Sequence, residues 1–532
     1  MSDELELTLH GTARFTDNAE LRAAGVFSGD GVLLGQSSAG ELARFNKDGH
    51  ILVFAPNGAG KGTGFVQPNL VKYKGSMVVL DPKGENAMRS AKHRAKDQRV
   101  VILDPFKQTG MPPEALGKYN PLASLDLDDK LNIMADLAGF AEALVPSRGS
   151  DKEAHWVNGA RMFVQGILLF MLVHEPPESR DLLRLYSLAF EAPETLDRLF
   201  DKLAEGLDPD EDVQRVSAAL GHWWKGKNER EFSSFRSIAH QELAWLSDDA
   251  WRNVLTGWND RLDLKSRPTT VYLALPFSRL QRYRNWLRLM VADLTQGVLN
   301  VPGQPIDQAG KQAPPVLFML DEAYAGLGRM DLILSAAATI RDAGGRIALV
   351  YQDLAQLKSL YKDDWESFLA NSGAALFWSV NDLEGMEYVS KRCGVGTAWV
   401  GDNVHGHSRQ LRFPDEIGVE DPNLMYCFLR SLRPALLTRL NVLTDHERFD
   451  QHLAKNDRYT TVQPTVAGSK QPRPHIPVDL GAGGMTVKQK EEAALLEELS
   501  VKFGHTVFRN ANGDIGFYDD KERFKVIKRD RD

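Results

Sequence analysis

The sequence Ala55-Pro-Asn-Gly-Ala-Gly60-Lys61-Gly62-Thr63-Gly64 directly follows an apolar run of strand length, residues 51–55, and directly precedes a helical pattern. A loop of small residues in this position lets backbone N–H groups surround a phosphate at the N-terminus of a helix. The lysine then reaches the β- and γ-phosphate oxygens. The predicted nucleotide-binding residues are Asn57, Gly58, Ala59, Gly60, Lys61, Gly62 and Thr63. The alternative is a glycine-rich turn that binds nothing.

The loop departs twice from the general phosphate-loop pattern G-x-x-x-x-G-K-[ST]. Ala55 replaces the first glycine, and Gly62 stands where a hydroxyl that binds Mg²⁺ is expected. Thr63 follows one residue later. We therefore expect either the Thr63 hydroxyl or a water molecule to complete the Mg²⁺ site.

A second candidate motif is the apolar run of residues 316–320, which ends in Asp321 and Glu322. In nucleotide-hydrolysing sites of this kind the first carboxylate holds Mg²⁺, usually through water, and the second polarises the attacking water. An apolar run before two acidic residues is weak evidence for such a site on its own, because many strands end in acidic residues. With a phosphate loop upstream in the same pattern of strands, it becomes a strong indication.

Three further polar residues are candidates for the same site. Gln352 follows the apolar run 347–351 and is a candidate γ-phosphate sensor, although a helix-capping or surface role is an equal alternative on position alone. Arg341 and Arg346 flank the turn before that run. Either is a candidate for contact with the nucleotide of a neighbouring subunit, whereas a solvated turn arginine is the commoner case.

The apolar runs along the chain predict the fold class. They are nearly continuous and alternate with helical patterns, which indicates a parallel sheet covered on both faces. The runs are residues 51–55, 77–80, 101–103, 271–275, 316–320, 347–351 and 375–378. Between about 125 and 265 only helical spacing is found, which predicts an all-α insertion in an α/β domain.

The predicted organisation is a first part of the nucleotide-binding domain, the all-α domain, the second part, a linker and a C-terminal segment. Their ranges are 1–124, 125–265, 266–458, 459–486 and 487–532. The linker is rich in Pro, Gly and Ser. Residues 487–503 have the pattern of an amphipathic helix, which suits docking to a partner or to the chain itself.

Composition excludes several classes of protein. The chain has 532 residues, 43% hydrophobic and 26% charged, with a net charge of −8. These values exclude a basic nucleic-acid coat and a mostly disordered chain. Two cysteines, Cys393 and Cys427, are too few for a disulfide framework or a cysteine-based zinc site, and they indicate a reducing compartment. The acidic start is not typical of a signal peptide, and the longest apolar stretch, residues 166–173, is shorter than the roughly 20 residues of a membrane span.

With these motifs the chain resembles the type IV coupling proteins, the TraG-like (VirD-type) family of hexameric ATPases in conjugation and type IV secretion. The resemblance covers residues from about 10 to 450. Besides the phosphate loop, it rests on ordered motifs along the chain. These are Gly11-Thr-Ala-Arg-Phe15, Val79-Leu-Asp81-Pro-Lys83-Gly84-Glu85, Leu320-Asp-Glu-Ala-Tyr-Ala-Gly-Leu-Gly-Arg-Met330, Gln352-Asp-Leu-Ala-Gln356-Leu357, Tyr361, Asn371, Asn381-Asp382 and Pro414-Asp415-Glu416-Ile417.

The resemblance implies a RecA-like P-loop ATPase domain with an inserted all-α domain and a small C-terminal appendage. It implies ATP and Mg²⁺ as cofactors, with Lys61, Asp321, Glu322 and the sensor Gln352 in the site and Arg341 supplied by the next subunit. The Gly62 departure is typical of this branch of the family. The implied function is to recruit a relaxase–DNA complex or protein effectors to a type IV secretion channel and to drive their transfer by ATP hydrolysis. The alternatives are a recruitment platform that binds ATP with little hydrolysis, and a duplex-DNA translocase.

The resemblance also implies partners and a location. The partners are components of the secretion machinery, a relaxase or effectors, and DNA, with a hexamer as the active form and a monomer expected in dilute solution. The run His222-Trp-Trp-Lys-Gly-Lys227 is a candidate for contact with single-stranded DNA, although tryptophans at helical spacing are more often core residues. Family members usually begin with transmembrane helices. We expect a cytoplasmic chain at the inner membrane, held there by a partner or by an anchor that has been removed.

Overall fold

The structure is a computed structural model, and it divides into two compact units, Met1–Arg458 and Tyr459–Asp532. The residues it describes are 10–129, 132–146, 154–205, 211–226, 228–256, 262–330, 339–398, 407–455, 508–509, 515–518 and 524–528. The first unit contains the phosphate loop and the two carboxylates that follow residues 316–320.

An eleven-stranded sheet forms the centre of the first unit, with the strand order β2-β1-β13-β12-β9-β3-β8-β7-β4-β6-β5. The strands are β1 (Val32–Gln36), β2 (Leu42–Phe45), β3 (His50–Phe54), β4 (Met77–Asp81), β5 (Arg99–Leu103), β6 (Thr269–Ala274), β7 (Val316–Leu320), β8 (Gly345–Tyr351), β9 (Ser372–Phe377), β12 (Leu424–Leu429) and β13 (Ala435–Thr438). From β9 to β5 every pairing is parallel. At the other edge β12, β13, β1 and β2 pair antiparallel. Each apolar run in the parallel part coincides with a strand.

Both faces of the sheet are covered, because alternate residues of each strand belong to different cores. In β3, Leu52 and Phe54 belong to one core and Ile51 and Val53 to the other. The helices α12 (Arg284–Asn300) and α15 (Leu354–Tyr361) contribute side chains to the first core, while α3 (Gln67–Lys72) and α4 (Glu85–Arg94) contribute to the second. The predicted α/β class with two covered faces is therefore confirmed.

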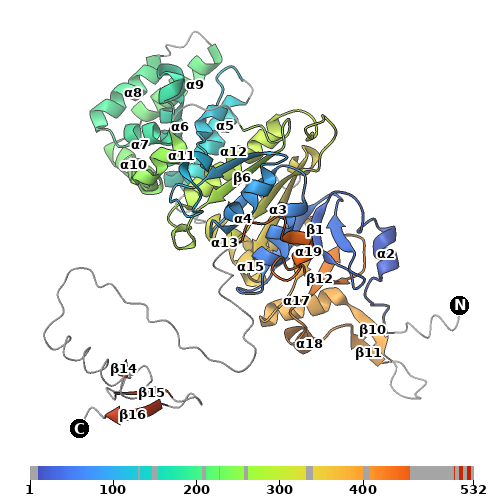
Figure 1. Ribbon diagram of the computed structural model, residues 1–532. Coiled ribbons are helices and arrows are strands. Elements are labelled where there is room, and N and C mark those ends of the chain that lie inside the picture. The colour runs from blue at the N-terminus through green and yellow to red at the C-terminus, as the bar shows by residue number, and fades with distance from the viewer. Residues whose placement is uncertain are drawn as a thin grey trace. The chain divides into compact units, whose positions relative to one another are not determined.

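The chain leaves the sheet after β5 and returns at β6, and the residues between them form a group of helices at one end of the first unit (Figure 1). These helices are α5 (Ile133–Leu144), α6 (Ala154–His174), α7 (Leu182–Ala189), α8 (Pro193–Glu205), α9 (Glu211–Lys225), α10 (Glu229–Leu243) and α11 (Arg252–Leu255). They lie within the predicted all-α insertion. The outer boundaries of that domain stay a prediction.

Helix α6 is long enough to span a membrane, with 21 residues and a mean hydropathy of 1.5 in its most apolar window. However, 61% of that window is buried inside the protein. The helix contacts α5, α7, α8, α9 and α10. A long apolar helix surrounded in this way is the expected centre of a helical bundle.

In the aromatic and basic run of α9, Trp224 packs inward, whereas His222 and Lys225 are exposed. Trp224 is buried, stacks on Phe200 with ring centroids 4.2 Å apart, and donates from Nε1 to Asp197 Oδ1 over 2.8 Å. Lys225 forms an ion pair with Asp201. Core packing is therefore the role of Trp224, while Lys227, the last residue of the run, lies outside the described residues.

The remaining elements of the first unit lie around the sheet. They are α2 (Asn18–Ala23), α13 (Ala323–Gly326), α16 (Trp365–Asn371), α17 (Leu383–Cys393), α18 (Pro414–Gly418), α19 (His446–Phe449) and the hairpin of β10 (Val395–Ala398) and β11 (His407–Gln410). Both cysteines are free and buried.

The second unit contains a small antiparallel sheet, β14 (Phe508–Arg509), β15 (Ile515–Tyr518) and β16 (Phe524–Lys528). These three strands lie within the predicted C-terminal segment, 487–532. The sequence of β16, Phe-Lys-Val-Ile-Lys, begins with the apolar–polar alternation that is typical of a strand. The predicted linker, 459–486, and the predicted helix, 487–503, lie outside the described residues.

Candidate functional site

The candidate site lies at the carboxyl edge of the parallel strands. In the sheet β8 lies between β3 and β7, and all three are parallel. The phosphate loop follows β3, Gln352 follows β8, and Asp321 follows β7. Parallel strands place the residues that follow them at one edge, and open α/β folds bind ligands there. The topology therefore brings three separate parts of the sequence together.

The phosphate loop has the conformation that its glycines allow. Gly58 and Gly60 have φ values of 80° and 77°, the left-handed region that favours glycine. The side chain of Lys61 is 8% exposed, and its Nζ donates to the carbonyl oxygens of Ala55 over 2.8 Å and Pro56 over 3.3 Å. A π-helical turn, Gly62–Val66, follows directly and continues into α3. The loop thus ends at a helix start, where backbone N–H groups favour a bound phosphate, and Lys61 is the long cationic side chain of the loop.

Two residues that the sequence analysis does not identify also contact this loop. Trp378 follows β9, is 1% exposed, and donates from Nε1 to the Ala59 carbonyl over 2.8 Å. Arg439 follows β13, and its side chain lies against Gly60 and Gly64. Trp378 is the last residue of the predicted apolar run 375–378. A tryptophan at the carboxyl edge of the sheet, where its indole N–H can find a partner, could therefore have been identified from the sequence. Arg439 follows a strand that the sequence analysis does not predict.

Glu322 has an unusual backbone conformation for a residue with a side chain. Its φ and ψ are 54° and 40°, in the left-handed region. Non-glycine residues there are strained, and they persist where the surrounding structure holds them, often at functional sites. Gln352 supplies such a contact, because its Nε2 donates to Glu322 Oε2 over 3.0 Å. Gln356 Oε1 in turn accepts from the Gln352 backbone N–H over 3.0 Å.

The charged groups of the site act on one another. Burial lowers the pKa of Lys61, while Glu322 and Asp321 oppose that shift. Burial and then the neighbouring Glu322 raise the pKa of Asp321 to about 6, and Lys61 opposes this shift. Two carboxylates thus lie in a partly desolvated position, with the ammonium groups of Lys61 and Lys83 near them. A divalent cation beside Asp321 would relieve the repulsion, so these residues fit a bound Mg²⁺.

Mg²⁺ in this position would need further ligands from the nucleotide. Among the described residues, no three or more His, Cys, Asp or Glu side chains lie together in a way that could hold a metal. Hard oxygen ligands suit Mg²⁺, which often binds one or two carboxylates together with substrate phosphates. The predicted protein ligands are Asp321 and Thr63. Thr63 Oγ1 lies at the loop and donates to the Gly60 carbonyl over 3.3 Å.

The structure does not bring Arg341 to the site of its own chain. Arg341 precedes β8, so it lies at the amino edge of the sheet, whereas the site lies at the carboxyl edge. Its Nε forms an ion pair with Asp342 Oδ1 at 3.0 Å. Arg346, the other candidate, is 5% exposed and donates to the carbonyl oxygens of Phe45 and Lys47. Arg346 therefore supports the sheet, and Arg341 is the arginine that stays available to a neighbour.

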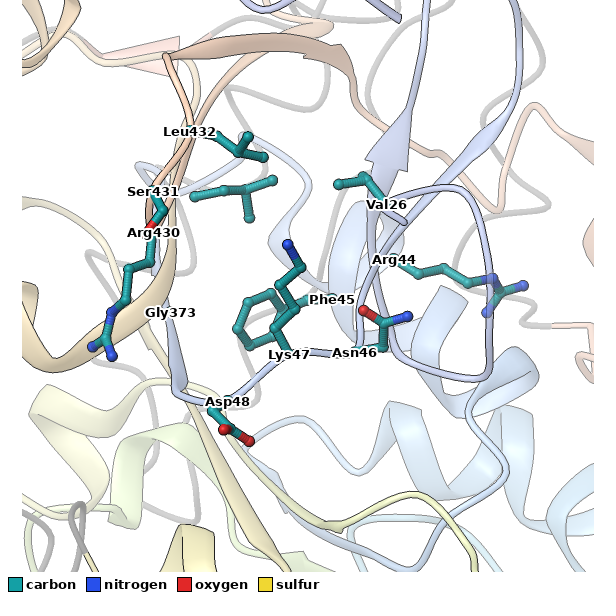
Figure 2. A pocket seen from close by; sticks show the side chains of 11 residues that line it. Val26, Arg44, Phe45, Asn46, Lys47, Asp48, Gly373, Arg430, Ser431 and Leu432 are labelled. Atoms are coloured by element: carbon teal, nitrogen blue, oxygen red, sulfur yellow. The ribbon is translucent and has the colours of Figure 1, made fainter. Parts of the chain in front are cut away.

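A pocket of about 490 Å³ also lies at the amino edge, and it contains none of the predicted site residues (Figure 2). Phe45 and Leu432 line it, and Figure 2 shows Lys47 pointing into it while Arg430 points away. The carboxyl-edge cluster and this pocket are thus separated by the length of the strands.

Comparison with known proteins gives the same fold. TrwB, a plasmid coupling protein solved in complex with the non-hydrolysable GTP analogue GDPNP, matches with a TM-score of 0.61 and 16% identity, over 80% of this chain and 93% of that one. TrwB in complex with ADP and Mg²⁺ matches with a TM-score of 0.60. The predicted RecA-like P-loop fold is confirmed by this likeness.

Sequence comparison identifies the family. Protein VirD4 of Agrobacterium fabrum is 27% identical over 466 residues, which is 82% of this chain and 66% of that protein. Conjugal transfer protein TraG of Escherichia coli is 26% identical over 439 residues, 73% of this chain and 65% of that protein. The chain thus spans just under two thirds of these relatives. The family model for conjugative DNA transfer by the type IV secretory system matches residues 14–411, and the chain belongs to this family of VirD4/TraG-type coupling proteins.

Proposed function

We propose that this chain is an ATPase that recruits substrate to a type IV secretion or conjugation channel and couples ATP hydrolysis to its transfer. The observation that carries the proposal is the contact between Gln352 and the strained Glu322, beside Lys61 and Asp321. A carboxylate held in a fixed orientation next to a phosphate loop is suited to accept a proton from an attacking water. A site that only binds nucleotide has no need of that arrangement.

In the proposed mechanism Lys61 and the loop N–H groups bind and orient the phosphates. Glu322 accepts the proton of the water that attacks the γ-phosphate, and Gln352 keeps the Glu322 carboxylate turned toward that water. Arg341 of the next subunit stabilises the charge that develops on the transferred phosphoryl group, as trans-acting arginines do. Because Arg341 lies at the opposite edge of its own sheet, it reaches a site only on a neighbouring chain.

Asp321 and Thr63 are proposed to hold Mg²⁺ together with the nucleotide. When bound, the ion neutralises phosphate charge. TrwB, a protein of the same fold, has been solved in complex with ADP and Mg²⁺, which supports binding of a nucleotide together with Mg²⁺.

The proposed partners are the secretion machinery, a relaxase or effector protein, and DNA, with a homohexamer as the active assembly. The relatives named as conjugal transfer proteins support this assignment. The proposed location is the cytoplasmic face of the inner membrane. The proposed domain boundaries are those of the sequence analysis, in which residues 125–265 form the substrate-facing all-α domain.

The experiment that tests the proposal is steady-state ATP hydrolysis, measured across protein concentrations with and without single-stranded DNA. A rate that rises more than linearly with protein concentration, and further with DNA, is expected for an assembling enzyme with a shared site. The Lys61→Ala variant is the control, and its turnover should be lost. A Lys61→Ala rate near wild type would contradict the assignment.

Two outcomes would favour other functions. Clear nucleotide binding without hydrolysis at any concentration would favour a recruitment platform. Vigorous turnover stimulated by duplex DNA, with no secretion partner bound, would favour a duplex-DNA translocase.

A further inference from the structure

Arg439 lies beside the phosphate loop although it is distant from it in sequence. Strand β13 pairs antiparallel with β12, and β12 pairs antiparallel with β9, so β13 runs in the same direction as β3. Arg439 is the first residue after β13 and therefore leaves the sheet at the edge where the loop lies. The Val442 N–H donates to the Thr63 carbonyl over 3.0 Å, which fixes this segment against the loop.

The Arg439 side chain fits in its position only because residues 60 and 64 of the loop lack side chains. A Cβ atom on Gly60 would lie 2.1 Å from Arg439 Nη1, and a Cβ atom on Gly64 would lie 2.9 Å from Arg439 Cγ. The aliphatic stem therefore packs on Gly64, and the guanidinium group packs on Gly60. Phosphate binding alone does not require glycine at position 64. The segment after β13 explains it, because a Cβ atom on Gly64 would also lie 2.8 Å from the Leu440 carbonyl oxygen.

The hydrogen-bonding capacity of Arg439 is mostly unused within the described part of the chain. Its Nη2 donates to Asn423 Oδ1 over 3.3 Å, and its Nε is buried with no partner there. A guanidinium group has five N–H donors in a planar fork that matches phosphate oxygens. A buried donor without a partner is costly, so it points to a ligand that the fold is built to accept.

The strand order shows which end of a nucleotide would meet Arg439. The proposed γ-phosphate residues, Glu322 and Gln352, follow β7 and β8, on one side of β3. Arg439 follows β13, on the other side of β3, beyond β9 and β12. A nucleotide whose γ-phosphate points toward β8 and β7 therefore extends its α-phosphate and ribose toward Arg439.

We propose that Arg439 is a nucleotide-binding residue that contacts the α-phosphate and ribose of the nucleotide held by the loop of its own chain. The inference rests on the proposed function, because it takes its direction from the γ-phosphate residues. It differs from the role of Arg341, which acts on the γ-phosphate of a neighbouring chain.

The test is calorimetric titration of the full chain with ADP and with a non-hydrolysable ATP analogue, both with Mg²⁺. The Arg439→Met variant keeps the stem that packs on Gly64 and removes the guanidinium group. We expect this variant to bind both nucleotides more weakly by the same factor, about 10-fold or more, because one charge-assisted hydrogen bond is lost. The matched control is Arg430→Met, on the same β12–β13 hairpin but at the amino edge, where Arg430 donates to the carbonyl oxygens of Ala370 and Ser372. Its affinities should equal those of the wild type.

The outcomes separate this inference from the function on which it rests. Wild-type protein that binds neither nucleotide would overturn the proposed function. Wild-type binding with unchanged affinity in Arg439→Met would overturn the inference alone, and so would a loss confined to the ATP analogue, which would indicate a γ-phosphate contact. Melting temperatures of the nucleotide-free variants are the remaining readout. If Arg439→Met and Arg439→Gln both melt well below the wild type, Arg439 supports the fold and the inference is wrong.

Discussion

Gln352 Nε2 donates a hydrogen bond to Glu322 Oε2 over 3.0 Å, and this bond joins the ends of the neighbouring strands β8 and β7. Glu322 is in the left-handed backbone region, and the bond fixes its carboxylate next to Asp321 and Lys61. The orientation of the proposed base therefore depends on a residue of another strand. The two residues are expected to act together, and substitutions at either should affect the chemical step more than binding.

Glu322→Gln is expected to abolish hydrolysis while nucleotide binding persists. The substitution keeps the size of the side chain but removes the group that accepts the proton, and such groups contribute about 100-fold or more to rate. Steady-state turnover and calorimetric affinity measure the two properties separately. Turnover within a few-fold of wild type would show that another group acts as the base.

Gln352→Ala is expected to lower kcat about 10-fold or more with little change in KM, because Glu322 loses the contact that orients it. Gln352→Glu should be worse still, since it sets a carboxylate against a carboxylate at hydrogen-bond distance. Steady-state kinetics of both variants test this order. A Gln352→Glu variant as active as wild type would mean that the observed bond has no part in catalysis.

Trp378→Phe is expected to weaken nucleotide binding several-fold, because the Ala59 carbonyl loses its indole partner and the loop loses a fixed point. A single neutral hydrogen bond contributes about 1 kcal/mol, which corresponds to roughly 5-fold in affinity. Trp365→Phe, at the start of α16, is the matched control and should bind like wild type. Equal affinities for all three proteins would show that the loop is held without Trp378.

The parallel part of the sheet could be predicted from the sequence because both of its faces are buried. Buried strands such as residues 316–320 are continuous apolar runs, and the acids that follow them are visible at once. In the antiparallel edge, β2 and β13 were not predicted, because they alternate between buried and half-buried residues and are only four residues long. Strands β1 and β12 were missed although their buried runs are nearly continuous. Arg439 was missed with β13. Its proposed role depends on the order of the strands in the sheet. The sequence does not show that β13 ends beside the phosphate loop.

The contribution of Mg²⁺ to nucleotide affinity is expected to fall as the pH is lowered through about 6. Burial and the neighbouring Glu322 raise the pKa of Asp321 to about 6, so below that value the carboxyl is protonated and competes with the cation. Above pH 7 the carboxylate is ionised, and its contribution to Mg²⁺ binding should be constant. Titrations at pH 5.5, 6.5 and 7.5, with and without Mg²⁺, measure this dependence.

Asp321→Asn is the control for that pH profile, because phosphate groups of the nucleotide also titrate near neutral pH. Their titration is common to both proteins, so the difference between the wild type and Asp321→Asn isolates the carboxyl. Identical profiles for the two proteins would show that Asp321 does not hold the cation.

Arg341 lies at the amino edge of the sheet and the proposed nucleotide site at the carboxyl edge, so the role proposed for Arg341 requires two chains for a complete site. Lys61→Ala and Arg341→Ala should each be inactive alone, since every interface then lacks one of the two residues. In an equimolar mixture about one quarter of the interfaces of a cyclic assembly pair an intact Lys61 with an intact Arg341.

Mixing the two inactive variants is therefore expected to restore hydrolysis. The recovered rate should grow with total protein concentration, because assembly is required. A mixture of Lys61→Ala with Glu322→Gln serves as the control, because both variants keep Arg341. An intact site needs Lys61 and Glu322 on the same chain. Neither variant has both, so this mixture can form no intact site. Recovery in the first mixture alone would establish a site shared between chains. If co-assembled Lys61→Ala and Arg341→Ala chains stay inactive, or if Arg341→Ala hydrolyses ATP unaided, the site is complete within one chain.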